Sequence, residues 1–297
     1  LSERDFILYE DGVQQEVAFF GSEEVPFNVA LVLDMSPSVA GSVEDIHDAA
    51  LAFVRQLRPQ DRVMVVSFDR EIHYLTDFTN DRGRLESAIR TTQTGSGTSV
   101  YDAVYQTVTR RLRNVEGRKA LILFSDGEDT TSQSSYDEAV NIVSESDVLV
   151  YGLRYPGNGG SVRVDPWPRR RNPIPNIQLP FPWPWPRRRR GNFADPNLTK
   201  SAVASSAQTW GRRGDFMTDI TNAGGGPVYD AEKISDLRGL AFRIADELRH
   251  VYVVSYYPSN SLTNGGYREI RIRVKDRDGL AVRHRKGYNA REMHGTT

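Results

Sequence analysis

The stretch Asn28-Val-Ala-Leu-Val-Leu-Asp34, followed by Met35-Ser-Pro-Ser38, decides the fold. Its first part is short and almost wholly apolar, which is typical of a parallel strand covered on both faces. Its end carries three oxygen-bearing side chains at alternate positions, Asp34, Ser36 and Ser38. If the segment stays extended, these side chains lie on one side of the chain, where the strand leaves the sheet.

Apolar strands alternate with amphipathic helices over residues 28–250. The expected strands are 28–34, 62–68, 119–124, 148–153 and 228–229, with 71–75 folding back as an edge strand. The expected helices are 42–57, 81–90, 100–112, 136–144, one that ends near Thr221, and 235–248. This alternation predicts an α/β fold with a doubly wound, mostly parallel, Rossmann-like sheet.

The two ends of the chain have a different pattern. Residues 6–9 and 13–20 flank Asp11-Gly12, the signature of a hairpin with a tight turn. Residues 252–257 indicate a strand, residues 270–274 alternate between apolar and charged side chains, and a turn at Asp278-Gly279 leads into 280–284. We expect both termini to form one small antiparallel β unit. The predicted domains are 1–26, 27–250, 251–290 and a tail at 291–297.

The formal net charge of −1 conceals an uneven distribution. Residues 157–191 hold eight arginines against one acid, Asp165, so they carry +7 and the rest of the chain carries −8. The same stretch contains eight of the fifteen prolines and three of the four tryptophans. Proline fixes φ and removes a backbone donor, so we predict that 157–198 form a disordered insertion.

Two interpretations of this insertion stay open. Arginine neutralises phosphate and tryptophan stacks on bases or favours a bilayer interface, so the stretch could contact an anionic membrane or nucleic acid. The arginines concerned are Arg169, Arg170, Arg171, Arg187, Arg188, Arg189 and Arg190. We favour the other interpretation, a tolerated low-complexity insertion without a partner of its own.

Composition excludes several classes of protein. The near-neutral total argues against a uniformly basic nucleic-acid coat or an acidic tail. Cysteine is absent, which excludes disulfide scaffolding, thiolate metal sites and cysteine nucleophiles. No apolar run approaches the roughly 20 residues that cross a bilayer. Because the chain begins at Leu1, we expect that any signal peptide has already been removed.

Five oxygen-bearing residues form the candidate metal site: Asp34, Ser36, Ser38, Thr98 and Asp126. Thr98 follows a glycine-rich turn, and Asp126 ends the fourth strand. In open α/β sheets, ligands bind at the carboxyl ends of strands where the connection direction reverses, so these side chains converge if the first and fourth strands are neighbours there. Two carboxylates and three hydroxyls form a hard oxygen set, which favours Mg²⁺, with Mn²⁺ or Ca²⁺ as alternatives.

The five positions together resemble the metal-ion-dependent adhesion site of von Willebrand factor A-type domains, over about residues 27–250. The resemblance implies a bound Mg²⁺ whose sixth ligand is an acidic residue, Glu or Asp, of a protein partner. Pro37 departs from the glycine that is more usual in the motif. The flanking segments, such as Glu10-Asp-Gly12 and Tyr256-Tyr-Pro-Ser-Asn260, resemble a bacterial group of related proteins. That second resemblance implies export to the periplasm, cell envelope or extracellular space.

Three functions remain in competition. The leading hypothesis is a non-enzymatic, metal-dependent protein-binding module for adhesion or scaffolding. The second is a Mg²⁺-dependent phosphoryl-transfer enzyme with Asp34 as nucleophile, although the second acid such enzymes carry two residues later is replaced by Ser36. The third is a structural scaffold in which the metal only orders the loops. The nearby acids Asp102, Glu128 and Asp129 are more typical of solvated helix starts than of ligands.

Overall fold

The computed structural model describes residues 1–21, 26–155, 215–249, 252–260, 266–275 and 282–290, all of them within one compact unit. The predicted disordered insertion at 157–198, the turn at Asp278-Gly279 and the tail at 291–297 lie outside the described residues. The domain boundaries given above therefore stay predictions.

A six-stranded sheet forms the centre of the α/β part, in the order β6-β5-β4-β7-β8-β9. The strands are β4 (Phe27–Asp34), β5 (Arg62–Phe68), β6 (Ile72–Tyr74), β7 (Arg118–Ser125), β8 (Val148–Arg154) and β9 (Val228–Asp230). Neighbouring strands run parallel except for β6, which returns antiparallel beside β5. The predicted doubly wound, mostly parallel sheet with an antiparallel edge strand is confirmed.

The continuous apolar sequence of β4 follows from burial on both faces. Val29, Leu31 and Leu33 belong to one hydrophobic cluster, and Ala30 and Val32 belong to the other. Side chains of a strand alternate between its two faces, so a strand with two covered faces has no polar position to alternate with. All five side chains are fully buried.

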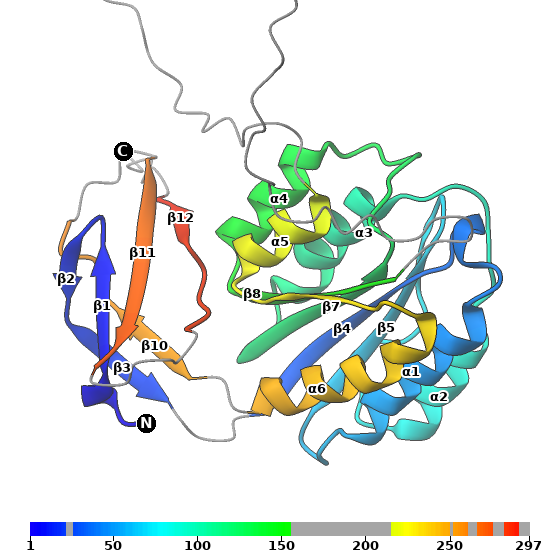
Figure 1. Ribbon diagram of the computed structural model, residues 1–297, viewed down its shortest axis with the longest axis horizontal. Coiled ribbons are helices and arrows are strands. Elements are labelled where there is room, and N and C mark those ends of the chain that lie inside the picture. Colours follow the sequence, from blue (N-terminus) through cyan, green and yellow to red (C-terminus); the bar gives the residue numbers. More distant parts are fainter. Residues whose placement is uncertain (22–25, 156–214, 250–251, 261–265, 276–281, 291–297) are drawn as a thin grey trace, which may run out of the picture. The chain divides into compact units, whose positions relative to one another are not determined.

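Within the described residues, six α-helices cover the two faces of the sheet (Figure 1). They are α1 (Val43–Arg55), α2 (Arg82–Arg90), α3 (Val100–Thr107), α4 (Tyr136–Glu145), α5 (Phe216–Gly224) and α6 (Leu237–Arg249). Helices α1, α2 and α6 pack on one face, and α3, α4 and α5 pack on the other. A π-helical turn, Val108–Leu112, continues α3. The helix expected to end near Thr221 extends to Gly224, where Gly225 adopts a left-handed φ of 82°.

Both termini contribute to small antiparallel sheets. A four-stranded sheet has the order β12-β11-β1-β2, and β3 pairs with β10. The strands are β1 (Phe6–Glu10), β2 (Val13–Gln15), β3 (Val17–Gly21), β10 (Val253–Tyr256), β11 (Tyr267–Val274) and β12 (Gly287–Asn289). The small antiparallel unit of the termini is thus confirmed. The expectation of one long second hairpin strand at 13–20 is wrong, because the chain breaks after Gln15 and β3 joins β10 in a separate sheet.

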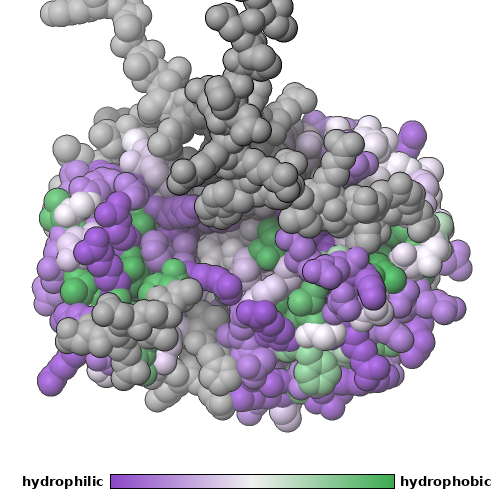
Figure 2. All heavy atoms as spheres, in the orientation of Figure 1, coloured by the Kyte–Doolittle hydropathy of each residue, from purple (hydrophilic) through white to green (hydrophobic). Residues whose placement is uncertain are grey.

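The described surface is mainly polar. In the view of Figure 2, hydrophobic residues appear as scattered groups among hydrophilic ones. The most exposed large hydrophobic side chains of the described residues are Val13, Phe19 and Tyr257, which lie in or beside the terminal strands. None of the described helices is both long and apolar enough to span a bilayer.

Candidate metal site

The candidate site lies where the sheet connections change direction. Strand β4 has β5 on one side and β7 on the other, so the carboxyl ends of β4 and β7 are neighbours. Asp34 is the last residue of β4, and Asp126 directly follows β7. The sheet therefore places these two carboxylates at the position where open α/β folds bind ligands.

Both carboxylate oxygens of Asp34 accept hydrogen bonds. The backbone N–H of Ser36 donates to Oδ1 over 2.9 Å, and the Ser125 hydroxyl donates to Oδ2 over 2.6 Å. The Asp34 side chain is 0% exposed. These bonds fix the carboxylate at the end of β4 in a single orientation.

The segment after Asp34 is a 3₁₀ turn, Pro37–Val39, with Ser36 as its N-cap. Ser36 is still extended, with φ −69° and ψ 165°, but Ser38 lies within the turn, so the expectation that all three residues share one extended segment is wrong for Ser38. Proline at the first position of the turn fits, because its fixed φ suits a helical start and its missing N–H has no partner to lose there. The turn nevertheless brings the hydroxyl oxygens of Ser36 and Ser38 to 2.9 Å from each other.

A chain of short oxygen contacts leads from Ser36 to Asp126. Ser38 Oγ lies 2.9 Å from Ser36 Oγ and donates to Oδ2 of Asp126, also over 2.9 Å. Oxygens at neighbouring corners of an octahedron with Mg–O bonds of about 2.1 Å lie about 3.0 Å apart. The spacing of these three oxygens therefore fits a small hard cation. The described residues contain no cluster of three His, Cys, Asp or Glu side chains that could hold a metal, so a metal here would depend on the hydroxyls.

Thr98 lies on a loop shaped by glycines. An added Cβ at Gly95 would be 1.3 Å from Oδ2 of Asp69, and at Gly97, which has a φ of 75°, it would be 2.8 Å from the Thr131 side chain. The Gly95 N–H donates to the carbonyl of Met35 over 2.8 Å, which joins this loop to the segment after β4. The backbone of Thr98 forms hydrogen bonds with Thr130 and Thr131. Within the part of the chain that the structure describes, its hydroxyl makes no hydrogen bond to the other four site residues.

Burial dominates the electrostatics of Asp34. It raises the pKa of this carboxyl from 3.8 to about 6, while hydrogen bonds from Ser125 and Ser36 lower the pKa and the negative charge of Asp126 raises it. A charged Asp34 is thus held in a site with too little positive compensation. A bound cation would supply that compensation.

Two residues of this region were not identified from the sequence. Ser125 ends β7 and its hydroxyl bonds both Asp34 Oδ2 and the N–H of Gly127. Tyr155 directly follows β8 and is 1% exposed. Both residues place a polar atom at the carboxyl end of an otherwise apolar strand, and this sequence pattern could have identified them.

The three nearby acids have local structural roles. Asp102 accepts the backbone N–H groups of Gln133 and Ser134, each over 2.8 Å. Asp129 accepts the N–H of Tyr101 at the start of α3, and Glu128 donates its backbone N–H to Asp126. Asp102 and Asp129 thus tie the loop after β7 to the start of α3.

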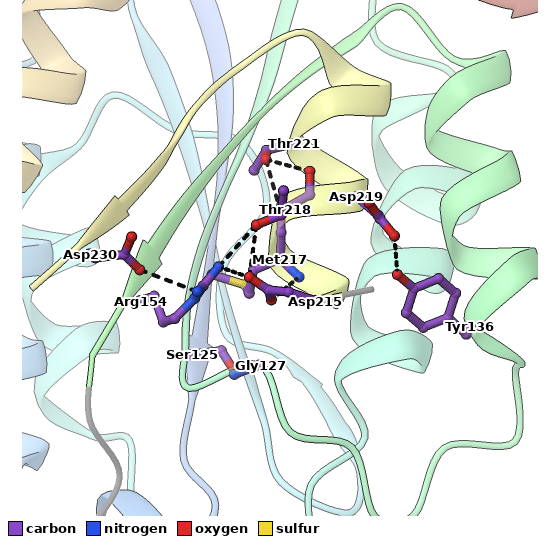
Figure 3. A network of polar contacts seen from close by, with 10 residues as sticks. All are labelled: Ser125, Gly127, Tyr136, Arg154, Asp215, Met217, Thr218, Asp219, Thr221 and Asp230. Atoms are coloured by element: carbon purple, nitrogen blue, oxygen red, sulfur yellow. Dashed lines mark hydrogen bonds and ion pairs between the residues drawn. The ribbon is translucent and has the colours of Figure 1, made fainter. Parts of the chain in front are cut away.

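An arginine at the end of β8 orders the same edge of the sheet. Figure 3 shows Arg154 between Asp230 of β9 and the pair Asp215 and Thr218 at the start of α5. Asp215 is also the N-cap of α5, accepting the N–H of Met217 over 3.2 Å. The guanidinium therefore joins the end of β8 to the helix that begins after residues 156–214.

Three comparisons with known proteins bear on this architecture. Residues 29–128 match the von Willebrand factor type A domain. Among curated proteins, none gave a significant match. Solved structures gave many matches.

Three of these structures illustrate the range. The von Willebrand factor domain of the type V pili tip protein Mfa5 from Porphyromonas gingivalis is 29% identical over 36% of this chain and 40% of that one, with a TM-score of 0.34. The von Willebrand factor type A protein from Catenulispora acidiphila is 14% identical over 82% of this chain and 50% of that one (TM-score 0.52). Proximal thread matrix protein 1 from the mussel byssus, solved with a zinc-occupied metal-ion-dependent adhesion site motif, is 10% identical over 80% of this chain and 49% of that one (TM-score 0.53).

The chain thus spans at most about half the length of these three structures. The family match covers β4 to β7 and the start of the following loop, which includes the segments that carry Asp34, Thr98 and Asp126. The fold match to the Catenulispora acidiphila protein covers 82% of this chain. Residues 29–128 are therefore similar in sequence to the von Willebrand factor type A domain, and the chain shares its fold with the solved structure of a von Willebrand factor type A protein.

Proposed function

We propose that the chain is a non-enzymatic protein-binding module whose partner contact depends on a divalent ion, Mg²⁺ first and Mn²⁺ or Ca²⁺ as alternatives. The observation that carries this proposal is the run of oxygen contacts from Ser36 through Ser38 to Asp126, beside the buried carboxylate of Asp34. Hydroxyls supply coordination without adding charge. The protein then supplies only the negative charge of two carboxylates, Asp34 and Asp126.

Each of the five residues has a role in this proposal. Ser36, Ser38 and Thr98 would supply neutral oxygens, and Asp34 and Asp126 would supply the negative charge that retains the ion. A divalent ion bound to so few charged ligands stays electrophilic and offers a coordination position to a Glu or Asp carboxylate of a partner. The protein contributes orientation, because hydrogen bonds to its backbone fix Asp34 and Asp126.

Burial disfavours the alternative in which Asp34 is the nucleophile of a phosphoryl-transfer enzyme. A nucleophile needs an oxygen with access to the substrate. The Asp34 side chain is 0% exposed, and both of its oxygens already accept hydrogen bonds. A metal-binding role tolerates such burial far better than in-line attack does.

Two further points belong to the proposal. Proximal thread matrix protein 1, which has the same fold, is described with zinc in its adhesion-site motif, so a test should include Zn²⁺ alongside Mg²⁺. The resemblance of the flanking segments supports export to the periplasm, cell envelope or extracellular space.

The decisive experiment uses a defined probe. Peptides that each contain one Glu or Asp, and matched peptides with Gln or Asn at that position, are immobilised and exposed to the protein in Mg²⁺ or in EDTA. We expect binding to a subset of the acidic peptides in Mg²⁺ only, and its loss in Asp34→Ala. Binding that survives both EDTA and this substitution would rule out the metal-bridged mechanism.

A second measurement separates the module from a mere scaffold. Calorimetric titration with MgCl₂ reports metal binding without any partner. If Mg²⁺ binds and raises the melting temperature but no acidic peptide is captured, the ion has only a structural role. Turnover of a generic phosphate ester that disappears in Asp34→Asn would instead revive the enzyme.

A further inference from the structure

Tyr155 lies next to the candidate metal site because of the strand register. Strand β8 pairs with β7 so that Arg154 is opposite Ser125. Continuing this parallel register by one residue puts Tyr155 beside Asp126, and paired strands lie about 4.8 Å apart. A tyrosine thus stands at the end of the third strand that reaches the site.

Tyr155 is buried in the core on one face of the sheet. It belongs to the same buried cluster as Met35 and Val39, which flank Ser36 and Ser38 in sequence. Residues 151, 153 and 155 alternate onto this face of β8, and all three are buried. The backbone and the packing therefore hold the ring in one place.

The Tyr155 hydroxyl has no hydrogen-bond partner among the described residues, although its oxygen is buried. A buried hydroxyl without a partner costs about 1–3 kcal/mol. Such a group is rare in folded proteins and requires an explanation, such as a ligand or an ion that completes it. Burial raises the pKa of Tyr155 well above its ordinary value, and the negative charges of Asp34 and Asp126 raise it further.

We propose that Tyr155 is a further residue of the metal site, whose hydroxyl donates a hydrogen bond to the oxygen shell of the bound ion, either to an Asp126 oxygen or to a water of that shell. This inference rests on the proposed metal binding. Asp34 and Asp126 lie close enough to act on the hydroxyl electrostatically, yet neither accepts a hydrogen bond from it. The hydroxyl therefore still has its hydrogen to donate when the ion and its ligands are in place.

The proposal makes Tyr155 a positioning residue. Neutral donors that orient the ligands of a metal typically change its affinity by 10- to 100-fold when they are removed. A phenol that stays protonated is suited to this task because it donates to anionic oxygens without adding charge. Because its pKa is raised above the ordinary value of a phenol, the hydroxyl stays protonated at neutral pH, where Asp34 is ionised.

The test replaces only the oxygen. Tyr155→Phe keeps the ring in the cluster, and Tyr151→Phe is the matched control, since Tyr151 lies on the same face of β8, four residues toward the opposite edge of the sheet. Mg²⁺ affinity is measured by calorimetry, and the melting temperature is measured in EDTA. We expect Tyr155→Phe to weaken Mg²⁺ binding about tenfold and to leave the melting temperature in EDTA unchanged or higher. We expect Tyr151→Phe to leave Mg²⁺ affinity unchanged.

Each other outcome overturns the inference. Equal Mg²⁺ affinity of Tyr155→Phe and wild type would show that the hydroxyl does not contact the shell, while the metal-binding proposal itself would stand. A Tyr155→Phe protein that melts lower in EDTA would show that the hydroxyl has a partner without the metal. Wild-type protein that does not bind Mg²⁺ at all would remove both the proposed function and this inference.

Discussion

Asp34→Asn is expected to stabilise the metal-free protein while abolishing Mg²⁺ binding. Burial raises the pKa of Asp34 from 3.8 to about 6. At about 1.4 kcal/mol for each pKa unit, the charged carboxylate therefore costs the native state about 3 kcal/mol at neutral pH. Asparagine has the same shape and no charge, so this cost disappears. The Ser125 hydroxyl, which donates to Asp34 Oδ2, must find a new arrangement at a cost of about 1 kcal/mol, so the net gain is about 2 kcal/mol.

The pH dependence has a definite sign. Between pH 3.8 and about 6 the native state keeps a proton on Asp34 that the unfolded chain releases, so the contribution of Asp34 to stability falls as pH rises through this window. Below the window the variant should therefore be less stable than wild type by about 1 kcal/mol, the cost at Ser125, and its advantage of about 2 kcal/mol should be complete above the window. A gain of about 2 kcal/mol corresponds to a rise of about 4–8 °C in melting temperature for a domain of this size.

The assay is thermal and denaturant unfolding of both proteins in EDTA, at about pH 4.5 and about pH 7.5, repeated with Mg²⁺ at the higher pH. Saturating Mg²⁺ at about 100 times its Kd should stabilise wild type by about 2.7 kcal/mol and leave the variant unchanged, so the order of stabilities reverses. A variant that is less stable than wild type in EDTA at the higher pH would refute the desolvation argument. An equal response of both proteins to Mg²⁺ would remove Asp34 from the metal site.

Three further substitutions test the surroundings of the site. Ser125→Ala removes a hydrogen bond that lowers the pKa of Asp34, so this pKa should rise. As pH is lowered, Mg²⁺ affinity should therefore begin to fall at a higher pH than in wild type. Mg²⁺ titrations at several pH values that give the same profile for both proteins would contradict this. Gly95→Ala places a Cβ 1.3 Å from an oxygen of Asp69, so the shifted loop should lower the free energy of unfolding by about 1–3 kcal/mol and weaken Mg²⁺ binding; retention of both would show that the loop adapts. Gly239→Ala, in an exposed turn of α6 with nothing within 4 Å, should stabilise the protein by about 1 kcal/mol in chemical denaturation and leave Mg²⁺ affinity unchanged; a loss of stability would argue against helix propensity as the cause.

Sequence patterns predicted the strands and helices well where burial is one-sided or complete. The apolar run of β4 and the amphipathic spacing of α1 each correspond to a described element. The terminal hairpin was predicted less well, because nothing in residues 13–20 distinguishes one long strand from two short ones. The break after Gln15 depends on β3 finding its partner β10, which is more than 230 residues away in the sequence.

The residues of the candidate site were selected from the sequence and stay a prediction, and the geometry expected for them differs from that of the structure. Asp34, Ser36 and Ser38 could be selected because polar residues end an apolar strand. Their convergence was attributed to an extended chain, whereas a 3₁₀ turn brings the two hydroxyls together. Local sequence does not reveal such a turn, since it forms between the end of β4 and a backbone hydrogen bond from Gly95 to Met35.

The sequence by itself determined the α/β class, the order of its elements and the oxygen-rich character of the site, because hydrophobic periodicity and side-chain chemistry are local properties. Only the tertiary structure decided that β4 lies between β5 and β7, that Ser125 bonds Asp34, and that the end of β8, with Tyr155 next to it, pairs with the end of β7 before Asp126. These relations join segments that lie about 30 to 90 residues apart along the chain. They arise from strand pairing and burial across the whole sheet, which no window of sequence contains.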